Sequence, residues 1–234
     1  MKFGVITFPG SNCDDDMAHV LGDVLGHEVI RLWHKDTDLG GLGEGDCVIV
    51  PGGFSYGDYV RAGAVARFSP IMESVVDFAG KGGYVFGICN GFQILCEAGL
   101  LPGALLRNRD QKFIARNAYL RVETNKSAIT SQLDASTVLK MPVAHAEGRY
   151  YADDATIAGL IANEQVLFRY SDGAGDLVAE AKLNGSTQNI AGICNAGRNV
   201  FGMMPHPERA SEEALGNTDG LALFTGLIEA AAVA

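Results

Sequence analysis

The first hundred residues alternate between short, apolar, β-prone runs and segments with helical periodicity, and no other feature of the sequence restricts the fold as strongly. The pattern predicts strands over residues 2–8, 28–33, 47–51 and 83–88. It predicts helices over residues 14–25 and 64–80. Because fully apolar strands separated by helices are typical of parallel sheets, we expect a parallel sheet with helices on both faces.

Beyond Leu100 the pattern changes to alternating apolar and polar residues. Residues 119–123, 138–143, 166–170 and 190–194 are predicted to be antiparallel or mixed strands with one solvent-facing side, and residues 220–232 a closing helix. No linker, charge run or repeat divides the chain. The predicted fold class is therefore α/β: a single-domain three-layer sandwich over residues 1–234, mainly parallel at its centre, with an additional antiparallel or mixed region in the C-terminal half.

Composition excludes several classes of protein. The 234 residues are 47% hydrophobic, enough for one sizeable core, yet no apolar run approaches the roughly 20 residues that span a bilayer. The N-terminus reads directly as a strand rather than a signal peptide. Five cysteines at irregular spacing without a CxxC pair disfavour disulfides and a metal site. The net charge of −10 disfavours nucleic acid. We expect a cytoplasmic protein without a membrane or nucleic-acid partner.

Cys89 has the sequence setting of a catalytic nucleophile. It lies between a predicted buried strand and a segment with helical spacing, and Gly87 and Gly91 flank it. This is the arrangement of a nucleophile elbow, with sulfur in place of oxygen. The start of the following helix would favour the thiolate. A buried structural thiol is the alternative, because that is the usual role of a free cysteine.

A cysteine nucleophile needs a base and a group that orients the base. His206 lies between Pro205 and Pro207, which predicts a stiff, exposed turn after an apolar strand. Glu208, two residues on, can face the same side and accept a hydrogen bond from the imidazole. The alternative is a proline-rich turn that caps the next helix. The other histidines are predicted to be surface or edge residues (His19, His27 and His34) or are ambiguous (His145).

Backbone N–H groups near Cys89 could form an oxyanion hole. Asn90 follows the cysteine, and Gly53 lies in the glycine-containing loop after the third predicted strand, where a backbone can approach a substrate closely. An ordinary βα loop is the alternative interpretation of the glycines. The sequence contains no GxxxxGK[ST] motif and no correctly placed GxGxxG motif, so it predicts no nucleotide site in this chain.

The segment Gly192 to Asn195 repeats Gly-Ile-Cys-Asn but differs in the residues that come after it. Ala196 to Asn199 leads into another predicted strand, residues 200–203, so a hairpin turn is expected there. Without a helix behind it, Cys194 would have neither the helix dipole nor the oxyanion amide. We therefore predict that Cys194 is structural.

Taken together, these motifs resemble the class I glutamine amidotransferases, in particular the glutaminase subunits of phosphoribosylformylglycinamidine synthase. The resemblance covers essentially the whole chain, through the Cys89 and His206 motifs and three further segments, residues 8–14, 51–64 and 144–150. One residue departs from the family pattern: Ala146 replaces the first glycine of His-Gly-Glu-Gly-Arg. A substitution there matters if the position requires a positive φ or a close approach.

The resemblance implies a mechanism and partners. Cys89 would be the nucleophile, His206 the base and Glu208 its orienter; Gly53 and Asn90 would form the oxyanion hole, and Gln93 would help to bind glutamine. Ammonia released from glutamine would pass to a synthetase subunit that uses ATP and Mg²⁺ to convert formylglycinamide ribonucleotide to formylglycinamidine ribonucleotide in purine biosynthesis. No cofactor is implied in this chain. A small third subunit is expected in the complex.

The same resemblance suggests where the synthetase would dock. Residues 145–150 and 108–117 carry dense polar and aromatic side chains in predicted loops, and they are candidates for that surface. Solvated loops are the alternative. The rival functions are an amidotransferase subunit of another biosynthetic pathway and a non-catalytic redox or chaperone-like protein with a reactive elbow cysteine.

Overall fold

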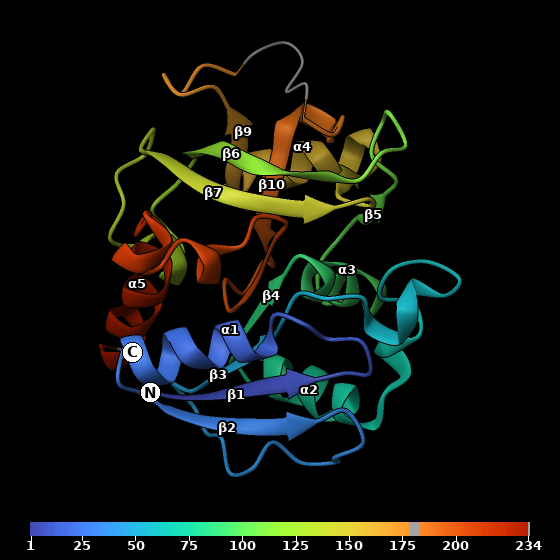
Figure 1. The fold of residues 1–234 in the computed structure, drawn as a ribbon, viewed down its shortest axis with the longest axis vertical. Helices are drawn as coiled ribbons and strands as arrows, with labels where there is room; N and C mark the ends of the chain where they lie inside the picture. The colour runs from blue at the N-terminus through green and yellow to red at the C-terminus, as the bar shows by residue number, and fades with distance from the viewer. Residues whose placement is uncertain (178–182, 234) are drawn as a thin grey trace.

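The described part of the chain, residues 1–177 and 183–233 of a computed structural model, is built around one nine-stranded mixed sheet (Figure 1). The strand order is β2-β1-β3-β4-β11-β10-β9-β6-β7. The strands are β1 (Lys2–Thr7), β2 (Glu28–Trp33), β3 (Cys47–Val50), β4 (Tyr84–Ile88), β6 (Ile114–Val122), β7 (Val138–His145), β9 (Val166–Ser171), β10 (Ile190–Cys194) and β11 (Val200–Met203). A separate antiparallel ribbon pairs β5 (Ala104–Leu106) with β8 (Arg149–Tyr151).

The N-terminal half confirms the predicted parallel sheet. Strands β2, β1, β3, β4 and β11 are parallel neighbours. The connection from β1 to β2 and that from β3 to β4 run in opposite directions along the sheet. Right-handed crossovers therefore place α1 (Asp14–His19) and α2 (Pro70–Gly80) on opposite faces. Figure 1 shows α1 in front of the parallel strands and α2 behind them.

The C-terminal half pairs antiparallel except where β11 joins β4, which confirms the predicted antiparallel or mixed region, but the expected solvent-facing side is wrong for two of its strands. β10 pairs with β9, β9 with β6, and β6 with β7, all antiparallel. β7 alternates between more and less buried residues, whereas every residue of β10 and all but the last of β9 are buried. The reason is their position: β9 and β10 lie inside the nine-stranded sheet rather than at its edge.

Two predicted helices differ from the observed ones. The segment 64–80 contains only a 3-10 turn at Ala66–Phe68 before α2 begins at Pro70. Pro70 occupies the first turn, and Ser69 before it is extended (φ −64°, ψ 139°), because proline disfavours a helical predecessor. The segment 14–25 is α-helical only to His19 and continues as a π-helical turn, Val20–Val24.

Two further helices belong to the second half. The closing helix is α5 (Leu221–Ala232), close to its predicted bounds. α4 (Asp154–Ala162) was not predicted, although its start carries a recognisable signal. The Asp153 carboxylate accepts a hydrogen bond from the N–H of Thr156 at 2.7 Å, which is an N-cap.

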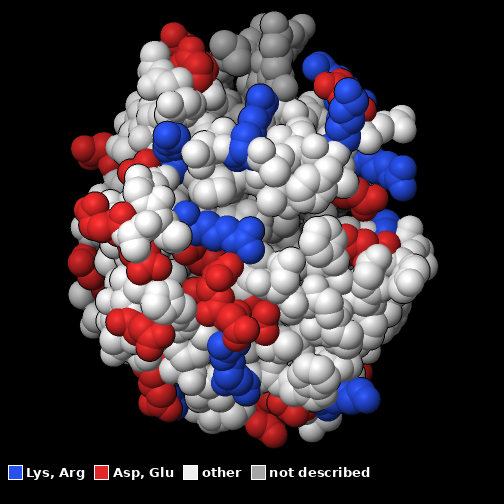
Figure 2. Space-filling view, in the orientation of Figure 1, with Lys and Arg blue, Asp and Glu red and all other residues white. Residues whose placement is uncertain are grey.

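The face of the molecule drawn in Figure 2 carries charged side chains of both signs. Figure 2 shows that, on the face drawn, Lys and Arg side chains are scattered between acidic ones rather than gathered in one patch. Among the described residues, no helix has both the length and the apolar character needed to cross a bilayer.

The sheet brings distant loops together at one edge. β1, β3, β4 and β11 are parallel and adjacent or nearly so, and their carboxyl ends lead into residues 8–13, 51–54, 89–90 and 204–208. In open α/β sheets this edge is where ligands bind. All the residues predicted from sequence to be catalytic lie in these four segments.

Candidate active site

Cys89 lies in the predicted elbow between β4 and α3 (Asn90–Glu97). Its backbone is in a strained conformation, with φ 51° and ψ −105°. Non-glycine residues rarely adopt positive φ, and such strain is concentrated at functional sites. The Cys89 N–H donates to Met203 O at 2.8 Å, which fixes the turn against β11. The side chain is 5% exposed and its S–H lies 3.8 Å from Ala144 O.

Close packing explains the two glycines of the elbow. A Cβ at Gly91 would lie 1.7 Å from Val50 O, and a Cβ at Gly87 would lie 2.6 Å from Leu95 Cδ1. Neither glycine has a positive φ, so contact rather than backbone conformation excludes a side chain. The glycines allow the first turn of α3 to lie directly against β3 and β4.

His206 and Glu208 form a buried pair beside this elbow. The His206 N–H donates to Pro142 O at 2.9 Å, and its Nδ1 lies 2.6 Å from Glu208 Oε1. The turn was predicted to be exposed, but His206 is only 2% exposed and Glu208 only 1%, because β7 packs over it. With Nδ1–H donating to the carboxylate, Nε2 is left to act as a base. That atom has no hydrogen-bond partner among the described residues.

Electrostatics link His206 to Cys89. Burial opposes the charged imidazolium, but the Glu208 carboxylate and the Cys89 thiolate outweigh it and hold the pKa of His206 well above its ordinary value. The raised pKa of His206 favours its imidazolium form. A positively charged imidazolium is the kind of neighbour that activates a cysteine nucleophile.

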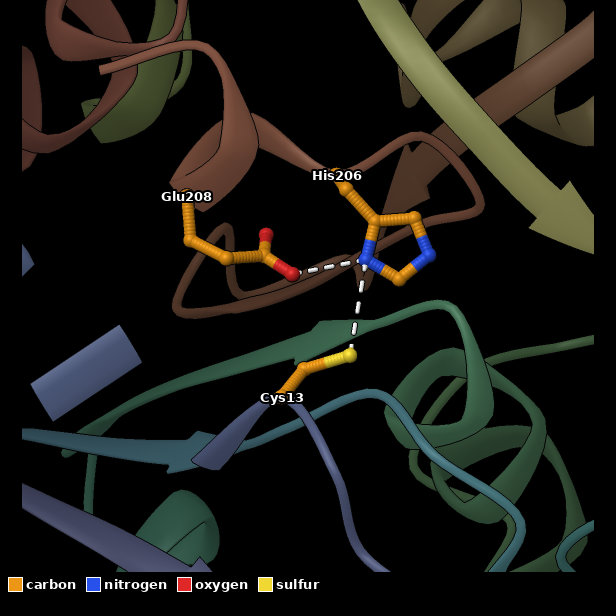
Figure 3. Close-up of side chains that lie close together, drawn as sticks. All are labelled: Cys13, His206 and Glu208. Carbon is orange, nitrogen blue, oxygen red and sulfur yellow. Dashed lines mark hydrogen bonds and ion pairs between the residues drawn. The ribbon is translucent and has the colours of Figure 1, made fainter. Parts of the chain in front are cut away.

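Cys13 also contacts the imidazole, and sequence reasoning missed it. Figure 3 shows its sulfur on the same side of His206 as Glu208, 3.9 Å from Nδ1. Arg209 Nη2 donates to the same sulfur at 3.2 Å. Burial, the largest effect, raises the pKa of Cys13, so a thiol is favoured there. One sequence signal could have identified Cys13: it lies in the loop that follows the first predicted strand. Loops after parallel strands meet at one edge of the sheet, where the active site was expected.

Donor atoms of Cys13, His206 and Glu208 lie within 4.8 Å of one another, a spacing that could hold a metal ion. The contacts favour a hydrogen-bonded histidine–carboxylate pair instead. A short hydrogen bond joins imidazole and carboxylate, and the Arg209 guanidinium already donates to the thiol. A cation would have to displace both interactions.

Gly53 lies in a loop that packs closely against the turn after β1. It forms an isolated antiparallel bridge with Ser11, in which Phe54 N–H donates to Gly10 O and Asn12 N–H to Gly52 O. In this type of bridge the N–H of Gly53 points away from Ser11. With φ 149° and Ser11 Cα only 2.8 Å from where a Cβ would be, the position requires glycine.

The start of α3 is held by side-chain hydrogen bonds. Asn90 Oδ1 accepts from Ser55 N–H at 3.0 Å, and its Nδ2 donates to Gln93 Oε1 at 2.9 Å and to Asp58 Oδ1 at 3.3 Å. Gln93 Nε2 donates to Glu147 O at 2.5 Å. Asp58 and Glu147 lie in segments that the sequence analysis named (51–64 and 145–150), but neither was predicted to lie beside the elbow, because that proximity depends on the folded loops.

The remaining histidines and the second Gly-Ile-Cys-Asn segment lie outside the Cys89–His206–Glu208 group. His19 is exposed and His34 follows the edge strand β2, in line with the predicted surface or edge positions, but His34 is buried, with its Nδ1 2.7 Å from the Tyr56 hydroxyl. The hairpin after Cys194 is confirmed by antiparallel pairing of β10 with β11. Burial raises the pKa of the Cys194 thiol to about 11.

His145 is buried close to the active site. Burial, and next the charge of His206, lower its pKa to about 4, so it is neutral. Its Nδ1 lies 3.1 Å from Asn108 Oδ1, and both residues are buried. These two residues therefore cannot form part of a docking surface, whereas the exposed residues of the same loops remain candidates. Ala146 does not have a positive φ, so its backbone conformation suits alanine.

Comparison with known proteins identifies close relatives along the whole chain. A family model described as a CobB/CobQ-like glutamine amidotransferase domain matches residues 1–219. The phosphoribosylformylglycinamidine synthase subunit PurQ of Koribacter versatilis is 56% identical over 232 residues, with 99% of each chain covered. The PurQ subunit of Moorella thermoacetica is 55% identical, with 98% of this chain and 96% of that one covered.

Solved structures of related proteins share the fold of this chain. PurLQS from Thermotoga maritima contains a chain that superposes with a TM-score of 0.85 at 40% identity, with 98% of both chains covered. A glutamine amidotransferase from the same organism superposes with a TM-score of 0.56 at 13% identity, covering 100% of this chain and 92% of that one. The second likeness shows a shared fold alone.

Proposed function

Because the chain belongs to the PurQ family, the glutamine amidotransferase subunits of phosphoribosylformylglycinamidine synthase, we propose that Cys89, His206 and Glu208 are its catalytic triad for glutamine hydrolysis. The observation that carries this assignment is the strained Cys89 elbow beside a histidine whose Nδ1 is held 2.6 Å from a buried carboxylate. A stand-alone redox thiol does not require this base and orienter.

In the proposed reaction, the Cys89 thiolate attacks the side-chain amide carbon of glutamine. The C–N bond then breaks as His206 Nε2–H gives its proton to the departing nitrogen, which leaves as ammonia. The γ-glutamyl thioester that remains is hydrolysed by water, from which His206 takes a proton, and glutamate and the free thiolate are released. Glu208 keeps the imidazole in the tautomer that presents Nε2 to these steps.

The backbone is suited to hold the charge that develops on the amide oxygen. We assign this role to the N–H groups of Asn90 and Gly53. The Asn90 N–H is one of the first free amides of α3, and the Gly53 N–H points away from its bridge partner. Gln93, one helical turn beyond Cys89, is assigned to the glutamine pocket. Its side-chain amide bonds to Asn90 and Glu147, so it shapes the pocket wall.

The chain acts as one subunit of a larger enzyme. The Thermotoga relative was solved as PurLQS, and we infer that this chain likewise assembles with a PurL-type synthetase and a small PurS-type subunit. The synthetase would bind ATP and Mg²⁺ and consume the ammonia in making formylglycinamidine ribonucleotide. We place this activity in the cytoplasm, where purine precursors are assembled.

The test compares two cysteines in the assembled complex. With formylglycinamide ribonucleotide, ATP and Mg²⁺ present, Cys89→Ala should abolish the glutamine-driven reaction and spare the ammonium-driven one. Cys194→Ala is the matched control, because it lies in the same Gly-Ile-Cys-Asn sequence but in β10. It should preserve both reactions. Loss of both activities in Cys89→Ala, or of neither, would contradict the proposed function.

A further inference from the structure

Glutamine differs from other primary amides by the α-ammonium and α-carboxylate at its far end. Given the proposed function, the site must recognise these charges if it is to reject simple amides. Four single bonds of about 1.5 Å each separate the amide carbon from the α-nitrogen, a span of about 5 Å. The α-ammonium therefore requires an acceptor close to Cys89, within the elbow's immediate surroundings.

Asp58 supplies a carboxylate in these surroundings. Its Oδ1 accepts a hydrogen bond from Asn90 Nδ2, on the residue that follows Cys89. The same nitrogen donates to Gln93 Oε1, so Asp58 and Gln93 approach one another at the first turn of α3. A carboxylate has about four acceptor positions, and this contact of 3.3 Å uses one of them.

The charge of Asp58 is uncompensated. Burial first, and then the neighbouring Glu147 carboxylate, raise the pKa of Asp58 to about 6, against the effect of the Asn90 hydrogen bond. No ion pair within residues 1–177 and 183–233 includes Asp58. Glu147 differs, because Arg107 Nε lies 3.4 Å from its Oε1. A half-buried carboxylate without a cation is expensive for the free protein unless a ligand brings the positive charge.

The backbone that carries Asp58 is held in an unusual conformation. Tyr56, Gly57, Asp58 and Val60 all have positive φ, of 52°, 68°, 54° and 73°. Left-handed geometry is tolerated by aspartate but is a clear outlier for a β-branched valine. The loop is anchored where Ser55 N–H donates to Asn90 Oδ1 and Ala62 N–H to Glu147 Oε2. These anchors hold the strained segment, and with it the Asp58 backbone, in place at the first turn of α3.

We propose that Asp58 is the residue that binds the α-ammonium group of glutamine and so determines the specificity of the site for an α-amino acid amide. Glu147 sets the local negative potential and holds the loop through Ala62, but its charge is shared with Arg107. Binding of the ammonium neutralises Asp58 and relieves its repulsion from Glu147.

The experiment measures ammonia release by the assembled complex, at a pH well above the pKa of Asp58. Three amides are compared: glutamine, glutaramate (glutamine without its α-amino group) and 4-aminobutanamide (glutamine without its α-carboxylate). Asp58→Asn should lower kcat/KM for glutamine and for 4-aminobutanamide by about 10²-fold, mainly through KM, because a half-buried charge partner of the ammonium group is lost. Its kcat/KM for glutaramate should be unchanged. Asp77→Asn, which removes the same charge from the exposed side of α2, should affect none of them.

Other outcomes would overturn the proposal. Equal losses on all three amides would show that Asp58 only supports the loop, and no loss on glutamine would show that it does not bind substrate. If Glu147→Gln, and not Asp58→Asn, abolished the preference for glutamine over glutaramate, the ammonium site would lie at Glu147. Failure of the proposed function is distinguishable, because the unaltered complex would then release no ammonia from glutamine.

Discussion

His206 is the residue whose environment contributes most to the chemistry of the site. A fully buried histidine on its own would stay neutral, as His145 does a short distance away. The pKa of His206 is raised instead, because the negative charges of Glu208 and Cys89 outweigh the cost of burial. The same protein interior therefore shifts the pKa values of two histidines in opposite directions. Only His206, which has a carboxylate partner, is favoured to hold the proton that the proposed mechanism passes to the departing amide nitrogen.

Replacement of Glu208 by glutamine should reveal this dependence. Without the carboxylate, burial is less opposed, so the pKa of His206 should fall and kcat for glutamine should decrease by about 10²- to 10⁴-fold. The pH dependence of kcat/KM and the NMR titration of His206 measure the two effects. A variant with an unaltered His206 pKa would contradict the assigned role of Glu208.

The stability of the same variant should depend on pH. A histidine whose pKa is raised in the folded state stabilises the fold fully below its unfolded value of about 6.5, and this contribution is lost as pH rises through the folded-state value. The unaltered protein and Glu208→Gln should therefore differ in unfolding free energy. The part of this difference that comes from His206 should be largest at acid pH and should shrink as pH rises. Urea titrations of both proteins over this range would measure it.

At the scale of secondary-structure elements, the active site depends on how closely α3 approaches the sheet. The helix begins directly after the nucleophile, and its Gly91 lies against the carbonyl of Val50 at the end of β3. This contact places the free N–H groups of α3 beside the Gly53 loop, which continues from β3. The proposed oxyanion hole is thus a consequence of one helix–strand contact.

Gly91→Ala should destabilise the protein by about 2 kcal/mol or more and lower the glutaminase rate, because a Cβ there would lie 1.7 Å from Val50 O. The matched control is Gly159→Ala in α4, where no atom lies within 4 Å of the added Cβ. That change should stabilise by about 0.5–1 kcal/mol, because alanine is the better helix former. Thermal unfolding of both variants checks the prediction. Equal changes in the stability of the two variants would contradict it.

At the scale of the whole molecule, one continuous sheet joins the parallel and antiparallel halves through the pairing of β11 with β4 and with β10. The proposed triad lies across this junction, since Cys89 follows β4 and His206 follows β11 while β7 covers the histidine. A disturbance in the antiparallel half should therefore be transmitted to the site and to the far edge of the sheet.

Leu120→Ala in β6 tests this coupling. The side chain is fully buried, so its truncation should cost about 2–5 kcal/mol. Trp33, the only tryptophan, lies on β2 at the opposite edge, and its fluorescence transition in urea should shift together with the far-UV circular dichroism. Tyr119→Ala, on the exposed face of the same strand, should cost less than about 1 kcal/mol. A shift in circular dichroism without a shift in Trp33 fluorescence would show that the two halves unfold separately.

The sequence alone was sufficient for features whose cause is local. Apolar runs and glycines around Cys89 predicted the strand, the turn and the helix, and the prolines around His206 predicted its turn. Local signals also explain the errors: periodicity extended the second helix back to residue 64, whereas Pro70 determines where it begins. The burial of β9 and β10 was missed because it depends on their neighbours in the sheet rather than on their own residues.

Only the tertiary structure determined which side chains surround the nucleophile. Cys13, Asp58 and Glu147 come from three loops. Cys13 contacts His206, Asp58 contacts Asn90, and Glu147 contacts Gln93, which is itself bonded to Asn90. Each of the three loop residues lies 32 or more positions along the chain from the residue that it contacts. No local preference encodes such contacts. They arise because parallel strands end at one edge of a twisted sheet, which brings their loops to the same place whatever the distance along the chain. The sequence by itself was sufficient to predict the proposed nucleophile and its base, and the fold determined the charges that surround them.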